Sequence, residues 1–276
     1  MSKLASGERI NRAADDAAGL SISENLRADI RSLNQAKRNA MDGVSLVQTT
    51  EGGLMETTNM LVRLRELAIQ SASDTIGDTE RGFLDKEYLA LKDEIDRIAN
   101  STEFNGTRVL SGGAENLAAD LAAGVPTYPL EIQVGKDYFP DTDAIDQLNP
   151  TNIIKIDLQN LNAYTDGGLQ LGKGEDGSRV ATKQGAQTSI SSLDFAITKV
   201  NEYRAYLGAI QNRFTSTIKN LSIQTENLSE ARSRIRDTDI AEETALMTQN
   251  SILQQAGTAV LATANMQPQI ALKLLG

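Results

Sequence analysis

Clustered carboxylates are the side chains of this sequence whose type and spacing could support acid–base chemistry. Asp15 and Asp16 are adjacent, and Asp93, Glu94 and Asp96 form a second cluster. Neighbouring carboxyl groups can act as acid and base when burial raises the pKa of one of them. Neither cluster lies in a run of large apolar residues, so we interpret both as helix-capping groups and solvated helix faces.

Composition excludes most other catalytic chemistry. The chain has no histidine and no cysteine, which excludes a Ser-His-Asp triad, a histidine-bound zinc ion, disulfides and thiol nucleophiles. The glycine-rich segment 165–177 contains neither a P-loop nor a dinucleotide-binding glycine motif, and we interpret it as a loop or hairpin. We therefore expect no enzymatic activity, no cofactor and no metal site.

Charge balance and hydropathy exclude two classes of partner. With 27 basic and 37 acidic residues the net charge is −10, whereas nucleic-acid binding needs basic patches. No stretch approaches the roughly 20 consecutive apolar residues of a membrane span, so we expect no membrane insertion. The opening MSKLASGERINRAADD has no apolar region behind a basic start, which predicts no cleavable signal peptide.

Both flanks of the chain show the period of long packed helices. Apolar side chains recur every seventh residue over 26–68 and again over 193–235, a spacing typical of coiled-coil-like packing. Because the intervening chain leaves one helix and enters the other, we expect the two helices to be antiparallel. The side chains predicted to pack this rod are Leu26, Leu33, Val47, Leu54, Leu61, Val200, Leu207, Phe214, Leu221, Leu228 and Ile235.

A third helix and a small β region are expected between these two. Apolar positions that step by three and four predict a helix over 80–100, with Thr79 as its cap, and Asn105-Gly106 marks a turn. Period-two alternation predicts short strands at 130–134 and 154–158. The predicted fold class is mainly α: a long antiparallel coiled-coil-like rod of three helices, a small β-containing tip and an α-helical terminal segment.

The C-terminal segment has too few charges for an ordinary exposed helix. Residues 240–276 carry only Glu242, Glu243 and Lys273, and Asp239 followed by Glu242 resembles a capping box that restarts a helix. The segment could pack on the chain's own core, but a rod offers little side surface for that. We therefore favour burial against other subunits. Its apolar side chains are Leu246, Leu253, Val260, Leu261, Ile270, Leu272 and Leu274.

The segment LVRLRELAIQSAS at 61–73 places Arg63, Glu66 and Gln70 on an outward polar face. Arg63 and Glu66 are spaced to pair, a contact that contributes only a few tenths of a kcal/mol. By pattern alone this is a solvated helix face.

Long runs at both ends of the chain resemble bacterial flagellin. The matching runs are KLASGERINRAADDAAGLSISENLRADI, LVRLRELAIQSAS, DEIDRIANSTEFNGTRVLSG, LGAIQNRFTSTIKNLSIQTENLSEARSRIRDTDIAEE and ILQQAGTAVLATANMQPQIALKLLG. The likeness covers 1–112 and 185–276 and is absent from the middle. It implies a non-enzymatic structural subunit that polymerises into the flagellar filament for swimming motility.

The resemblance also implies how the chain is divided and where it acts. It implies an extracellular flagellar location, reached through the flagellar type III export apparatus without a cleaved signal. Flagellins usually have a further helical segment before the position of Met1, so we expect a truncated or late start. The implied domains are a remnant of the N-terminal inner or linker segment (1–20), the N-terminal half of the helical rod (21–112), a variable β/loop tip (113–188), the C-terminal half of the rod (189–236) and a filament-core helix (237–276).

Partners follow from the resemblance as well. They are copies of the chain, other flagellins in the same filament, an export chaperone, and the cap and hook-junction proteins. A Toll-like innate receptor senses many flagellins through the helical region, and by motif its contact carries over to Arg63, Leu67 and Glu87. A hook–filament junction protein, which shares flagellin-like ends, is the alternative. The intact RIRDTDIAEE and ANMQPQIALKLL runs favour flagellin.

Overall fold

The computed structural model describes residues 2–112, 129–137, 151–164, 168–172 and 177–275, and the side chains of 266–275 are outside that description. The chain forms two compact units. Unit 1 combines Met1–Ser32 with Ile223–Gly276, and unit 2 is Leu33–Ser222. Within the described residues, no helix has the length and apolarity needed to cross a membrane.

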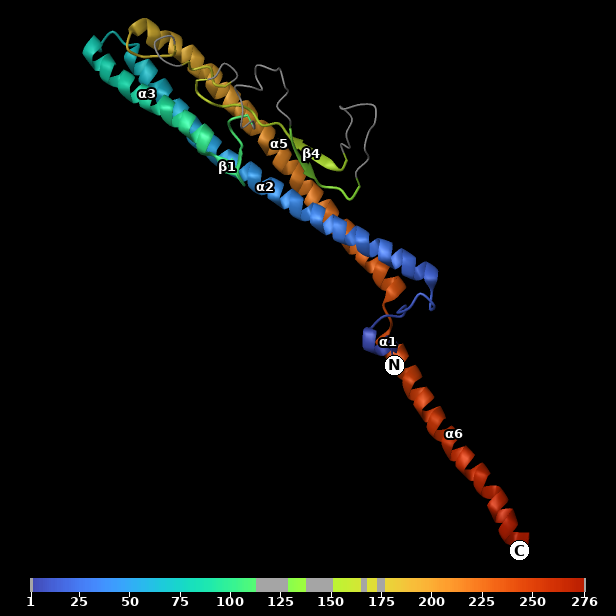
Figure 1. Cartoon of the computed structure of the whole chain (residues 1–276). Helices are drawn as coiled ribbons and strands as arrows, with labels where there is room; N and C mark the ends of the chain where they lie inside the picture. Colours follow the sequence, from blue (N-terminus) through green and yellow to red (C-terminus); the bar gives the residue numbers. More distant parts are fainter. Residues whose placement is uncertain (1, 113–128, 138–150, 165–167, 173–176, 276) are drawn as a thin grey trace, which may run out of the picture. The chain divides into compact units, whose positions relative to one another are not determined.

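Two helices are far longer than usual for a globular protein. Helix α2 runs from Ala17 to Ser71 and α5 from Lys183 to Arg236, with 55 and 54 residues. At 1.5 Å per residue each is roughly 80 Å long. Helix α3, Asp78–Ser101, is shorter and lies alongside α2 (Figure 1). The mainly helical fold is confirmed.

In unit 2 the long helices are antiparallel, as expected. Near the end of α2, Arg65 contacts Asp194 at 2.7 Å, and Lys183 at the start of α5 contacts Asp74 at 2.7 Å. Gly43, nearer the start of α2, lies very close to Phe214 of α5. Any side chain larger than hydrogen at Gly43 would place its Cβ atom 2.7 Å from the Phe214 ring, so α2 and α5 approach closely at this point. The heptad side chains that are buried in this unit are Leu33, Val47, Leu54, Leu61, Val200, Leu207, Phe214 and Leu221.

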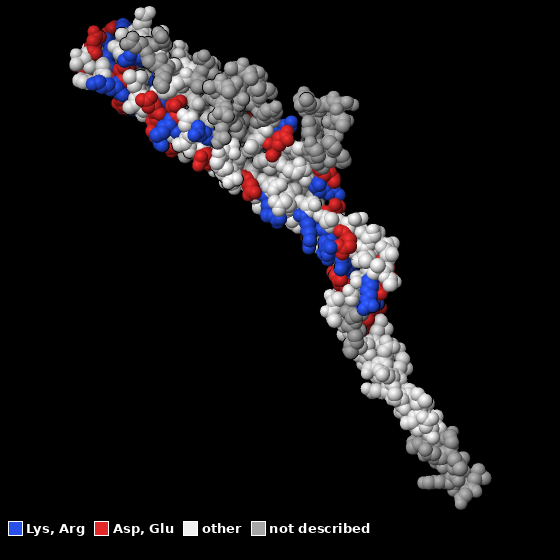
Figure 2. Space-filling view, viewed as in Figure 1, with Lys and Arg blue, Asp and Glu red and all other residues white. Residues whose placement is uncertain are grey.

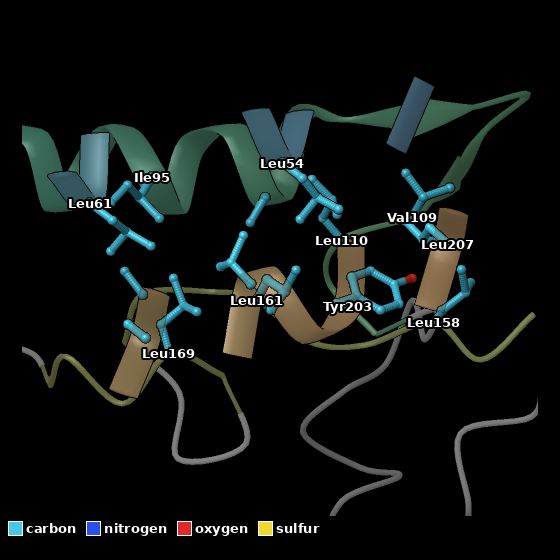
Figure 3. Close-up of a cluster of buried hydrophobic side chains, with 14 of the residues drawn as sticks. Leu54, Leu61, Ile95, Val109, Leu110, Leu158, Leu161, Leu169, Tyr203 and Leu207 are labelled. Carbon is cyan, nitrogen blue, oxygen red and sulfur yellow. The ribbon is translucent and has the colours of Figure 1, made fainter. Parts of the chain in front are cut away.

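The core of unit 2 also includes the described residues 151–164, 168–172 and 177–182, which precede α5 and which we call the connecting segment. Leu161 and Leu169 from this segment point toward Leu54 and Leu61 of α2 and Ile95 of α3 (Figure 3). Their backbone is held as well, because the Leu161 N–H donates to the Leu110 carbonyl at 2.8 Å. The connecting segment is therefore part of the packed core.

Two small antiparallel sheets complete unit 2. Strands β1 (Glu103–Phe104) and β2 (Thr107–Arg108) form a hairpin. Asn105 and Gly106 have φ values of 51° and 80° at its turn, the left-handed geometry that Asn-Gly favours. Strands β3 (Leu130–Gln133) and β4 (Ile153–Ile156) pair in the register Leu130 to Ile156. The Asn105-Gly106 turn and the strands β3 and β4 were predicted from the sequence.

Unit 1 contains α1 (Ser2–Ser6), the start of α2, the end of α5, and α6 (Ile240–Leu275). The heptad residues Leu26, Leu228 and Ile235 are half-buried here. The helix restart at Asp239 is present, since its Oδ1 accepts the Ala241 and Glu242 N–H groups at 2.8 and 3.3 Å.

The expected cap of α3 was wrong. The helix begins at Asp78, one residue before Thr79, and its N-cap position is Gly77, which makes no side-chain capping bond. The Asp78 carboxylate instead pairs with Arg81 at 2.9 Å.

Candidate functional site

Helix α6 exposes large apolar side chains on a nearly uncharged surface. Leu253, Val260 and Leu261 are 60%, 66% and 62% exposed, and Leu246 is 45% exposed. Between Ile240 and Asn265 the only charged side chains are Glu242 and Glu243, and Figure 2 shows the described part of α6 beyond them in white. Ile270, Leu272 and Leu274 lie on the helix, but their side chains are outside the described part. Exposed apolar surface of this kind marks a protein–protein contact site.

The link between α5 and α6 is held by Arg236. Its guanidinium contacts Glu8 at 2.7 Å and Glu24 at 2.5 Å, and its side chain is only 13% exposed. Hydrogen bonds to these two carboxylates raise the pKa of Arg236. Backbone bonds join the same segments, because the Arg9 N–H donates to the Arg236 carbonyl at 2.6 Å. Arg236 thus connects the N-terminal residues of unit 1 to the start of α6.

A second group of charged residues is exposed on α2 and α3. The Arg63 guanidinium donates to the Glu87 carboxylate at 2.8 Å and 3.0 Å and to Glu66 at 3.1 Å. The hydrogen bond to Glu87 is the main reason that the pKa of Arg63 is raised. Leu67 is fully buried. The structure therefore brings Arg63 and Glu87 together on the surface and places the Leu67 side chain in the core.

The carboxylate clusters act as local hydrogen-bond acceptors. The Asp15 carboxylate accepts the Asn11 and Arg12 N–H groups at 3.2 and 2.9 Å, and these bonds lower its pKa. A hydrogen bond from Arg97 lowers the pKa of Glu94. Both shifts are opposite to the raised pKa that a carboxylic acid catalyst needs. The capping interpretation fits these contacts.

A buried polar network, which sequence analysis missed, holds the connecting segment of unit 2. The Lys92 ammonium donates to the carbonyl oxygens of Leu171, Gly172 and Ser178 at 3.0, 2.8 and 3.0 Å. The Lys92 side chain is fully buried, and burial lowers its pKa to about 8. Because three carbonyl oxygens occupy its three donors, Lys92 serves here as an anchor and not as a nucleophile.

Asp85 and Ser71 extend this network. The Asp85 carboxylate pairs with Arg179 at 2.7 Å and accepts the Val180 N–H at 3.0 Å. The Ser71 hydroxyl donates to the Val180 carbonyl at 2.5 Å. No local sequence pattern signals these contacts, since the partners are 79 to 109 positions apart.

Both ends of the chain match known family models. Residues 1–115 match the bacterial flagellin N-terminal helical region, and residues 190–275 match the bacterial flagellin C-terminal helical region. A flagellin of Halalkalibacterium halodurans is 42% identical over 275 residues, covering 100% of this chain and 90% of the relative. A flagellin of Bacillus subtilis is 41% identical over 292 residues, with coverages of 100% and 91%.

Solved structures agree with these matches. The crystal structure of Bacillus cereus flagellin aligns with a TM-score of 0.50 and 32% identity, covering 71% of this chain and 94% of that one. A putative hook-associated protein from Vibrio parahaemolyticus aligns with a TM-score of 0.61 over 81% of this chain and 100% of that one, but at 14% identity it shares the fold alone. The two matched regions and the identity over the full chain show that this protein belongs to the bacterial flagellin family.

Proposed function

We propose that this flagellin joins the filament mainly through α6, whose apolar side chains become buried against neighbouring copies. As a member of its family, the chain is a structural subunit that polymerises into the extracellular flagellar filament. The observation that carries the proposal is the exposure of Leu253, Val260 and Leu261 on a helix nearly free of charge. Burial of such side chains contributes roughly 25 cal/mol per Å² of apolar surface.

The geometry of α6 fits a polymer contact. Leu253 and Leu261 differ by eight positions and Val260 by seven, so the three lie along one side of the helix. Contacts between unlike surfaces of identical copies do not close a pair and continue as a helical polymer. Leu246, seven positions before Leu253, lies on the same side of the helix. Ile270, Leu272 and Leu274, which spread around the last turns of α6, are also part of the proposed filament-core interface.

A matched pair of substitutions tests this role. Leu253→Gln should leave the helix content of the free subunit unchanged, because the side chain has no packing there to lose. It should abolish or strongly slow seeded assembly, measured by electron microscopy and sedimentation. The neighbouring Gln254→Asn keeps an exposed, uncharged polar side chain and should slow assembly less. Normal filaments from Leu253→Gln would contradict the α6 interface. Short oligomers from the unmodified chain would contradict polymerisation itself.

Export through the flagellar type III apparatus, with an export chaperone and the cap and hook-junction proteins as partners, is part of the proposal. Its support is the membership of the chain in the bacterial flagellin family. The chain should remain inside cells whose flagellar export gate is inactivated. Secretion that persists in such cells would contradict this route.

Recognition by a Toll-like innate receptor is proposed for the exposed Arg63 and Glu87 pair. Both side chains are about half exposed, at 49% and 45%, so a partner can reach them on the free subunit. Leu67 would support this surface from the core, since contact through its side chain would require it to leave that core.

Binding measurements with the free subunit test the receptor contact. Arg63→Ala and Glu87→Ala should each weaken binding of the receptor ectodomain, and their effects should be non-additive because the two residues pair. Arg97→Ala is the matched control, because Arg97 is an exposed arginine on α3 that pairs with Glu94 at 2.6 Å. Equal affinities for all three variants and the unmodified chain would count against the contact.

A further inference from the structure

A second row of exposed side chains follows α2 inside unit 2. Met41, Gln48, Met55, Val62 and Ile69 recur every seven residues, and we name them the methionine row. Its four apolar members are 45%, 51%, 46% and 49% exposed. Residues at this spacing lie along one side of a helix, over roughly 40 Å in this case. The row is therefore a narrow apolar strip, because the other large apolar side chains of α2 within unit 2 are buried or half-buried.

Polar residues border the strip on its outer side. The next position of each heptad is exposed and polar along the whole length, from Asp42 through Glu56 to Gln70. The preceding position of each heptad, for example Leu54 and Leu61, is buried in the core of unit 2. The methionine row is thus a strip bounded by exposed polar residues on one side and by buried core residues on the other.

The size of the strip indicates its occupant. A stable pair of proteins buries roughly 800 Å² on each partner, far more than four half-exposed side chains supply. The strip is too small to hold a dimer by itself, but it can contribute to a polymer in which each subunit contacts several copies. Because this chain polymerises with itself, a second copy of the chain is the occupant that fits.

We propose that the methionine row contacts a second copy during assembly, and that oxidation of Met41 and Met55 by peroxide blocks the free subunit from joining the filament. The inference rests on the proposed assembly function and adds a modification site to it. A methionine sulfur attacks one oxygen of hydrogen peroxide, an S–O bond forms, the O–O bond breaks, and water leaves. The thioether is oxidised to a sulfoxide and the peroxide is reduced.

The product has different physical properties from the starting side chain. A sulfoxide is polar, so its burial against an apolar partner surface is unfavourable, whereas the thioether packs readily. Enzymatic reduction of the sulfoxide restores the thioether, which makes the block reversible. Once Met41 and Met55 are covered by a neighbouring copy, peroxide reaches them less easily. The assembled state is therefore protected and the free subunit is sensitive.

The other methionines of the chain provide internal controls. Met60 is half-buried and packs against the core of unit 2, so it should oxidise more slowly than Met41 and Met55. Among the methionines whose side chains the structure describes, Met247, which is 39% exposed on α6, is the main competing site. Replacement of methionine by leucine keeps the volume and apolarity of the side chain and removes the sulfur.

The test compares peroxide treatment of free subunits and of filaments, using the full chain. Peptide mass spectrometry follows sulfoxide at each methionine, and seeded assembly is measured by electron microscopy. We expect Met41 and Met55 to oxidise several-fold faster in the free subunit than in filaments, with loss of assembly in parallel. The leucine variants are made in a Met247→Leu/Met266→Leu background, so that the methionines of α6 do not contribute. The background variant should lose assembly after treatment, whereas the variant that adds Met41→Leu and Met55→Leu should assemble normally before and after treatment. Methionine sulfoxide reductases should restore assembly of the oxidised unmodified chain.

Three results would overturn the proposal. Oxidised subunits that carry sulfoxides at Met41 and Met55 could assemble normally, the variant without Met41, Met55, Met247 and Met266 could remain sensitive to peroxide, or Met41 and Met55 could oxidise equally fast in filaments. Each result leaves the assembly function intact, because the untreated chain still forms filaments. Failure of the untreated chain to assemble would instead contradict the proposed function.

Discussion

At the scale of single residues, several buried polar side chains of unit 2 bind backbone groups of the connecting segment. Lys92 donates to three carbonyl oxygens, Ser71 donates to the Val180 carbonyl, and Asp85 accepts the Val180 N–H. Every residue offers a backbone carbonyl, and every residue except proline offers an N–H. These contacts therefore hold the segment largely independently of its side-chain sequence.

Replacement of Lys92 by methionine should lower the free energy of unfolding at pH 7 by about 1–3 kcal/mol, because three buried carbonyl oxygens lose their donor. The loss of stability caused by this substitution should become larger as the pH rises. The pKa of Lys92 is about 8 in the folded chain and 10.5 when unperturbed, so between these values the unfolded chain holds more protons than the folded chain. Unfolding free energy then rises with pH across this window in the unmodified chain, by on the order of 3 kcal/mol, and not in the variant.

Urea unfolding of the unmodified chain and of Lys92→Met at pH 7.5, 9 and 10.5 measures how the difference in their unfolding free energies changes with pH. Titrations of the tyrosines cancel in the comparison, since both proteins contain them. A difference in stability that stays constant with pH would contradict the low pKa of Lys92.

At the scale of elements, the junction of α5 and α6 is built from charges and caps. Helix α5 ends at Arg236, α6 begins at Ile240, and Asp239 caps the new helix. Arg236 contacts Glu8 and Glu24, and the Thr238 N–H donates to the Gly7 carbonyl at 3.1 Å. The break between the helices is thus a bonded junction within unit 1.

Arg236→Gln should loosen this junction. The substitution removes charge-assisted hydrogen bonds to two carboxylates, and we expect local opening to become easier by about 1–3 kcal/mol. Hydrogen exchange at the Arg9 and Thr238 amides should accelerate accordingly. Arg234→Gln is the control, because Arg234 is 72% exposed and lies 3.6 Å from Glu230. Equal exchange rates in the two variants would show that Arg236 does not hold the junction.

At the scale of the whole molecule, the apolar residues of the long helices serve two purposes. In unit 2 the heptad residues of α2 and α5 pack inward with α3 and the connecting segment (Figure 3). In unit 1, the large apolar side chains of α6 that the structure describes are exposed. Burial of the first group stabilises the subunit, and burial of the second group is the contribution that we propose for polymerisation.

Two adjacent positions on α2, one buried and one exposed, test whether only the buried apolar residues stabilise the subunit. Leu61 is fully buried and Val62 is 46% exposed. Leu61→Ala should lower the free energy of unfolding by about 2–5 kcal/mol, because it leaves a cavity in the core. Val62→Ala should change it by about 0.5 kcal/mol or less. Thermal and urea unfolding followed by circular dichroism provide the comparison, and similar losses in both variants would argue against the assignment of the core.

Local sequence patterns predicted the elements that depend on near neighbours. The heptad spacing indicated α2 and α5, the Asn105-Gly106 pair indicated the hairpin turn, and alternation indicated β3 and β4. These features follow from repeat period and backbone preference, which residues close in sequence determine. Family resemblance, carried by the two ends of the chain, indicated the filament role.

Only the tertiary structure decided which distant residues meet. Lys92 reaches carbonyl oxygens 79 or more positions away, and Arg236 pairs with Glu8 across 228 positions. The resemblance implied that Leu67 joins Arg63 in a receptor contact, yet packing of α2 places the Leu67 side chain in the core. The heptad period indicates which side of a helix is buried, but it does not indicate which other segment covers that side. That choice depends on how helices separated by the whole middle of the chain pack together.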